Sequence, residues 1–61
     1  MCVLIKYMNV NSKINICCEV AYKDTEDECF IEAMKNFRQS YPGKNRILEV
    51  IDASALGADH N

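Results

Sequence analysis

The alternation of apolar and polar residues predicts three strands and one helix. Residues 1–8 are almost wholly apolar, so a strand there would have two apolar faces, as in the centre of a sheet. Residues 13–23 alternate cleanly, which is typical of a half-buried strand whose apolar face lies against the core. That apolar set is Ile14, Ile16, Cys18, Val20 and Tyr22. Residues 45–52 are again rich in aliphatic side chains and predict a third strand.

Residues 24–41 change to the period of an amphipathic helix. Thr25 followed by Glu28 fits a capping box with Thr25 as the N-cap, and Asp24 is an alternative cap. One stripe of the helical wheel is apolar and faces the core. Its members are Phe30, Ala33, Met34, Phe37 and Tyr41. The helix is expected to end at Tyr41–Gly43, because a proline disfavours helical backbone at the residue before it.

These elements predict an α+β fold of two layers with the order ββαβ. The polar break at residues 9–12 contains two asparagines, which tolerate positive φ, and forms a hairpin turn. We expect a three-stranded sheet of order 2-1-3, because this order places the most apolar strand in the middle. The helix packs on one face. A single domain covers residues 1–52, and residues 53–61 form a C-terminal tail that starts with a helical turn.

The second face of the sheet has no predicted element to cover it. We expect Cys2, Leu4 and Cys17 on this face, and an exposed apolar patch usually marks an interface. The core of so small a domain supplies only about 3–5 kcal/mol. A homodimer through the open sheet face is therefore predicted. The alternative is that the tail folds back over the same face.

Length and composition narrow the classes of function. The chain has 61 residues, with seven Lys plus Arg against nine Asp plus Glu. It has little room for an enclosed active-site cavity. It contains no glycine-rich phosphate loop, and Ser54, Asp59 and His60 crowd together in the tail. We therefore expect no enzyme and no cofactor. The sequence contains no run of about 18 apolar residues, so we expect no membrane span.

The four cysteines are Cys2, Cys17, Cys18 and Cys29. Cys17 and Cys18 are adjacent in a strand, so their side chains point to opposite faces and do not chelate together. With no C-x-x-C motif and one histidine in the tail, no metal site is expected. A disulfide framework needs a secreted context. We expect four reduced thiols that pack as small apolar side chains in a reducing cytoplasm.

Acidic residues gather around the predicted helix start. Asp24, Asp27, Glu28 and Glu32 are the members that we assign to a partner-binding surface. Acids in a first helical turn also complement the helix dipole, and this structural role is sufficient to explain them. As a surface, they would suit a basic groove on another protein.

A basic cluster follows at the other end of the helix. Its members are Lys35, Arg38, Lys44 and Arg46. They offer an alternative nucleic-acid contact, in which Tyr7, Tyr22 and Tyr41 would stack on bases. The pattern instead assigns Tyr22 and Tyr41 to the core, and the chain is acidic overall, so nucleic acid is the less favoured partner.

The stretch Cys29–Gly43 resembles the helix of many very small proteins encoded by bacteriophages and mobile elements. In these proteins a hairpin precedes a helix with an Ala-x-x-x-Phe spacing, here Ala33 and Phe37, and Tyr41–Gly43 precedes a last strand. The similarity of layout covers residues 1–52. It implies a protein that acts without catalysis, as anti-CRISPR proteins and phage antitoxins do.

From this resemblance we expect an inhibitor that occludes a bacterial defence protein of CRISPR-Cas type, or a toxin, in the host cell cytoplasm. Two other functions stay open. One is a small nucleic-acid-binding regulator that uses the basic cluster. The other is a subunit of a larger assembly, docked through its open sheet face.

Overall fold

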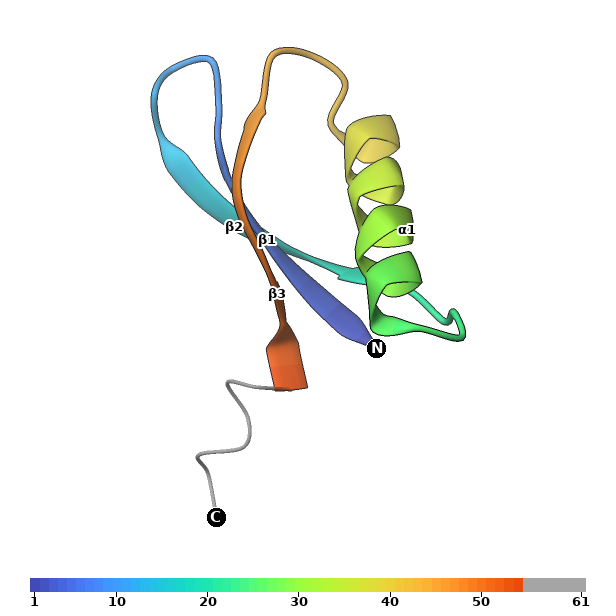
Figure 1. The fold of residues 1–61 in the computed structure, drawn as a ribbon. Coiled ribbons are helices and arrows are strands. Elements are labelled where there is room, and N and C mark those ends of the chain that lie inside the picture. The colour runs from blue at the N-terminus through green and yellow to red at the C-terminus, as the bar shows by residue number, and fades with distance from the viewer. Residues whose placement is uncertain (55–61) are drawn as a thin grey trace.

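The computed structural model describes residues 1–54, and these contain three strands and one helix (Figure 1). The elements are β1 (Cys2–Met8), β2 (Ile14–Val20), α1 (Glu26–Ser40) and β3 (Arg46–Asp52). The strands form one antiparallel sheet in the order β2-β1-β3, and the helix packs on one of its faces. The predicted α+β fold is confirmed, including the central position of the first strand. Beyond Ser54, the predicted tail lies outside the described residues.

The core lies between β1 and α1. Val3 and Ile5 of β1 are fully buried against Ala33 and Phe37 of the helix. Tyr7 closes the same face, with its ring centroid 4.8 Å from that of Phe37. Burial raises the pKa of the Tyr7 phenol above its usual value. The apolar stripe predicted for the helix is thus the surface that meets the sheet.

Local side-chain contacts set the ends of α1. The Glu28 backbone N–H donates to the Thr25 hydroxyl at 3.2 Å, and the same hydroxyl donates to the Glu28 carboxylate at 2.9 Å. Thr25, rather than Asp24, is therefore the N-cap. At the other end the Tyr41 N–H reaches the Phe37 carbonyl at 2.8 Å. Gly43 then adopts a φ of 131°, which favours glycine over residues with a side chain.

The hairpin turn between β1 and β2 is organised by Asn9. Its side-chain oxygen accepts from the backbone N–H groups of Asn11, at 2.9 Å, and Lys13, at 3.0 Å. The predicted turn is confirmed, but the positive φ of 61° falls on Ser12 and not on an asparagine. The side chain of Asn9 instead performs the turn-forming role typical of this residue.

The register of the hairpin corrects one prediction. Cys2 lies opposite Val20, and Leu4 lies opposite Cys18. The apolar set of β2 therefore faces away from the helix. Cys17 lies opposite Ile5 and packs against the core, so its placement on the open sheet face was wrong, whereas Cys2 and Leu4 do lie there. A shift of one residue exchanges the two faces of a strand, and the turn sets this register.

Two further placements differ from expectation at the end of β2. Tyr22, expected in the core, is 85% exposed. Ala21 is buried instead, where its carbonyl accepts from the terminal ammonium group of Met1 at 3.0 Å and its N–H donates to the Met1 carbonyl. The chain leaves the sheet directly after this contact, so the alternation of β2 does not continue to Tyr22.

Candidate functional site: an open sheet face and two charged ends

The face of the sheet that points away from α1 is called the open face here. Its apolar side chains come from all three strands. They are Leu4, Met8, Ile14, Ile16, Val20 and Ile51. Ile14, Ile16 and Val20 are 54%, 65% and 50% exposed, although the interior of a protein is their usual place. Because the apolar face of β2 is turned outward, this patch is more apolar than the sequence suggested.

Two opposite charges lie in the middle of the open face. Lys6 of β1 and Glu49 of β3 are direct partners across the two strands. Beside them is a shallow hollow of about 150 Å³, lined by Leu4, Lys6, Ile16, Glu49 and Ile51. Opposite charges at paired positions attract each other. The centre of the face is thus close to electrically neutral, with an apolar surround.

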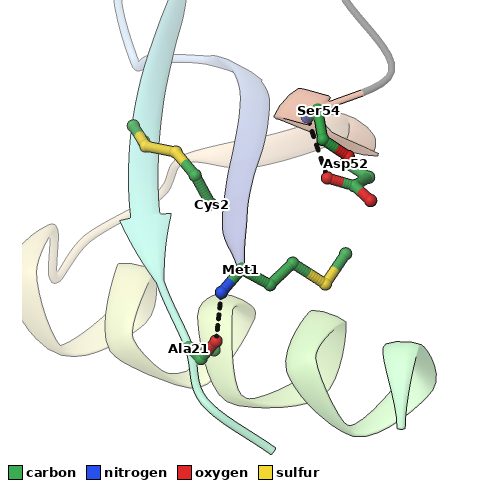
Figure 2. Close-up of a disulfide and its surroundings, with 6 residues drawn as sticks. Met1, Cys2, Ala21, Asp52 and Ser54 are labelled. Atoms are coloured by element: carbon green, nitrogen blue, oxygen red, sulfur yellow. Dashed lines mark hydrogen bonds between the residues drawn. A yellow bond between two sulfur atoms is a disulfide. The ribbon is translucent and has the colours of Figure 1, made fainter. Parts of the chain in front are cut away.

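A disulfide joins Cys2 and Cys18 on the open face (Figure 2). The two residues are diagonal neighbours on adjacent strands, with a Cα–Cα distance of 6.4 Å. The prediction of four reduced thiols is wrong for this pair. The same alternation that separates Cys17 from Cys18 places Cys18 on the face of Cys2, and the register of the hairpin brings them together.

The other two cysteines are free and lie on the helix side of the sheet. Cys29 is buried, with its sulfur 3.7 Å from the Ala21 carbonyl oxygen and 3.8 Å from that of Lys23. Burial raises the pKa of the half-buried Cys17 thiol, and the Glu19 carboxylate adds to this effect. Among residues 1–54, no three potential metal ligands come together.

Cys17 is expected to be a slow nucleophile. Because its pKa is raised, less thiolate is present at neutral pH than in an unstructured peptide. Native protein treated with iodoacetamide should label Cys17 more slowly than a peptide of residues 13–21, as followed by mass spectrometry. The rate of Cys17 labelling should also reach its plateau at a higher pH in the protein than in the peptide. Labelling of Cys17 as fast as in the peptide would contradict a raised pKa of this thiol.

An acidic end lies where α1 begins. This end also holds the start of β1 and the end of β2, because the chain enters the helix directly from β2. Four carboxylates there are exposed: Asp24, Glu26, Asp27 and Glu28. Glu32 follows one turn later and is half-buried. Of the predicted acidic surface, the structure therefore brings Asp24, Asp27 and Glu28 together, with Glu26 added and Glu32 at its margin.

A basic end lies opposite, at the hairpin turn and the start of β3. Met8 pairs with both Ile14 and Arg46, so the two segments meet at this end of the sheet. Four exposed cations gather there: Lys13, Arg38, Lys44 and Arg46. Lys35 lies one turn earlier on α1. Lys13 was missed because it is distant in sequence from the other three cations. The predicted sheet order nevertheless implied that the hairpin turn and the start of the third strand lie at the same end of the sheet.

An aromatic cluster accompanies the basic end. Tyr41 is 42% exposed, and its ring lies 5.7 Å from that of Tyr7 and 5.2 Å from that of Phe37. Tyr41 is thus partly the core residue that the helical pattern predicted and partly a surface residue. Tyr41 directly follows the last residue of α1 and so lies at the same end of the molecule as the basic end.

Comparison with protein-family models, curated proteins and solved structures gives no match to this chain. Within residues 1–54, no helix has both the length and the apolar character required to cross a membrane. Residues 1–54 define a two-layer α+β arrangement in which none of the described elements covers the second, apolar face of the sheet, and acidic and basic side chains lie mostly at opposite ends.

Proposed function

We propose that this chain is a non-catalytic binding protein of the kind that bacteriophages and mobile elements encode against a bacterial defence or toxin protein. It acts in the host cell cytoplasm by covering a basic surface of its target with its acidic end. The observation that carries this proposal is the gathering of four exposed carboxylates at one end of the molecule. The resemblance of layout supports the class of target.

The acidic end is suited to recognition because its position is fixed. The carboxylates follow a capped helix start, where the hydrogen bonds of Thr25 hold the first turn in place. An excess of one sign of charge, here four exposed carboxylates beside one exposed lysine, Lys23, steers an oppositely charged partner and rejects partners of like charge. The net charge of the whole chain, −2, understates the negative charge of the acidic end, because the cations lie mostly at the other end. Proteins that bind nucleic acids offer basic grooves of matching character.

Loss of charge at the acidic end is expected to weaken target binding. The variant Asp24→Asn/Asp27→Asn leaves the Thr25–Glu28 cap intact and removes two charges. Its affinity for the target should fall at least about tenfold, because truncating interface charges typically costs more than 1 kcal/mol. The measurement is capture by tagged protein from nuclease-treated bacterial lysate, identification by mass spectrometry, and titration of the purified target.

A matched control is Asn11→Lys/Gln39→Lys, which changes the net charge by the same amount at exposed positions outside the acidic end. This control should bind the target as the parent does. Equal binding by the asparagine variant and the parent would refute the role of the acidic end. Equal weakening in both variants would show that only the total charge matters.

The basic end supports a second candidate, a small nucleic-acid-binding regulator. The supporting observation is that Lys13, Arg38, Lys44 and Arg46 are exposed at the same end of the molecule as the partly exposed Tyr41. Binding of a labelled oligonucleotide would then weaken with salt, with a slope of about −3 to −4 in log–log form for four phosphate contacts. Capture from lysate that disappears after nuclease treatment would favour this function over the first.

A further inference from the structure

We infer that the open face is covered by the open face of a second copy of this chain, with the strands of the two sheets antiparallel across a twofold axis. This inference goes beyond the proposed function, because it concerns the open face, which the proposed function does not use. It specifies the residues and the geometry of the pairing.

The first step is that the open face is unfavourable in water. Six aliphatic or methionine side chains share it, and the outward side of β2 alone leaves Ile14, Ile16 and Val20 at least half exposed. Burial of apolar surface is favourable by about 25 cal/mol per Å². A domain with so small a core gains comparatively more from covering such a patch than a large protein does.

The second step identifies the occupant. A twofold contact presents the same surface from both sides, so every group must be matched by a group of that surface itself. The open face meets this condition at its centre because Lys6 and Glu49 are opposite in charge and adjacent. A partner whose surface carries one sign of charge would be attracted by one of these two groups and repelled by the other, whereas a second copy offers both signs.

The third step gives the orientation. If the strands of the two copies ran parallel, the two basic ends would lie together. Lys6 of one chain would then lie over Lys6 of the other. In the antiparallel arrangement the basic end of each copy lies over the acidic end of the other. The long-range charge distribution therefore favours the antiparallel dimer. In this arrangement β2 lies over β2, with Ile14 of one copy near Val20 of the other.

The size of the face sets the expected affinity. Three strands of seven residues cover a flat area of about 14 by 23 Å, at spacings of about 4.8 Å and 3.3 Å. This area, about 320 Å², is less than half of the roughly 800 Å² that specific interfaces typically bury on each partner. We therefore expect a weak dimer that is populated at high protein concentration and becomes monomeric on dilution.

Analytical ultracentrifugation of the oxidised protein, from about 5 µM to about 1 mM, tests the pairing over the range that this interface size implies. Ile16→Glu should raise the dimer dissociation constant at least about a hundredfold, because it buries a second carboxylate beside Lys6 and leaves an excess negative charge at the centre of the face in each copy. Ile31→Glu is the control: Ile31 is 63% exposed on the helix, against 65% for Ile16 on the open face. It should leave the dimer unchanged.

The charge pair gives a second test that adds no charge to an apolar position. Lys6→Glu places two carboxylates opposite each other and should weaken the dimer, whereas Lys6→Glu/Glu49→Lys should restore it. A monomer throughout the concentration range, or a dimer indifferent to Ile16→Glu, would overturn the pairing. If the protein is a monomer throughout, the open face is available to a different protein. Target capture through the acidic end can still succeed in that case, so the two proposals fail separately.

Isotope-filtered NOE spectra of a dimer mixed from ¹³C-labelled and unlabelled chains test the orientation. Contacts between the methyl groups of Ile14 and Val20 should appear. Within one chain these residues lie about 20 Å apart along the same strand, so such contacts arise only between copies. Intermolecular contacts between Val20 and Ile51 would instead show parallel strands and overturn the antiparallel arrangement.

Discussion

Replacement of Phe37 by alanine is expected to unfold the domain at room temperature. Phe37 is fully buried, and its ring contacts the rings of Tyr7 and Tyr41. Phe→Ala in a core costs about 3–5 kcal/mol, which includes the lost apolar burial and the cavity that remains. A domain of this size has a total stability of about the same magnitude, so this one change removes nearly all of it.

Circular dichroism during urea titration measures this effect. Phe37→Ala should show an unfolded or largely unfolded spectrum before urea is added. Phe30→Ala deletes the same atoms from a half-buried ring at the margin of the core and should retain a cooperative transition at a lower urea concentration. Comparable transitions for Phe37→Ala and the parent protein would mean that the helix does not pack on the sheet through this ring.

Removal of the disulfide is the second large change. The bond between Cys2 and Cys18 closes a loop across the hairpin, with a separation of 16 residues. In the chain-entropy model a loop of about 15 residues gives about 3 kcal/mol of stability, because the bond restricts the unfolded chain. Cys2→Ser/Cys18→Ser should lower the free energy of unfolding by about this amount.

The free energy of unfolding is obtained from denaturant titrations of the oxidised protein, the double variant and the protein reduced with dithiothreitol. The reduced protein and the double variant should agree, and both should be less stable than the oxidised form. Cys17→Ser, next to the bond but on the other face, is the control for the loss of a free thiol. Equal stability of the oxidised and reduced protein would show that the bond contributes nothing.

This prediction bears on where the protein works. In the cytoplasm of most cells, thiols are kept reduced. If the chain acts there as proposed, Cys2 and Cys18 are thiols during function, and the disulfide does not supply stability. Dimer formation through the open face would then supply part of the missing stability, because association stabilises the folded form by a free energy that rises with the logarithm of protein concentration.

The fold could be predicted because each element has a local cause. The capping box at Thr25, the helical stripe through Phe37 and the doubly apolar first strand each point to one structure. The outward direction of β2 could not be predicted in this way. Since β1 is apolar on both faces, either register of the hairpin would place apolar residues against it, and the turn around Asn9 decides between them.

The disulfide and the place of Lys13 in the basic end escaped prediction for the same reason. Both depend on residues from different strands, and their proximity follows from pairing rather than from spacing along the chain. Cys18 meets Cys2 only in the observed register. Lys13 meets Arg46 only because β2 and β3 both flank β1. The acidic end, in contrast, was visible because its carboxylates are close in sequence.

The central position of β1 has a consequence for how the chain folds as it is made. The ribosome produces β1 first, yet β3, its partner along one whole edge, is completed only at Asp52. Until then the hairpin and helix can form while one edge of the central strand stays without hydrogen-bonding partners. Unpaired strand edges invite association with other chains. The sheet is therefore completed only after β3 has been made, by the closing of contacts between distant segments, which is the slow step in such topologies.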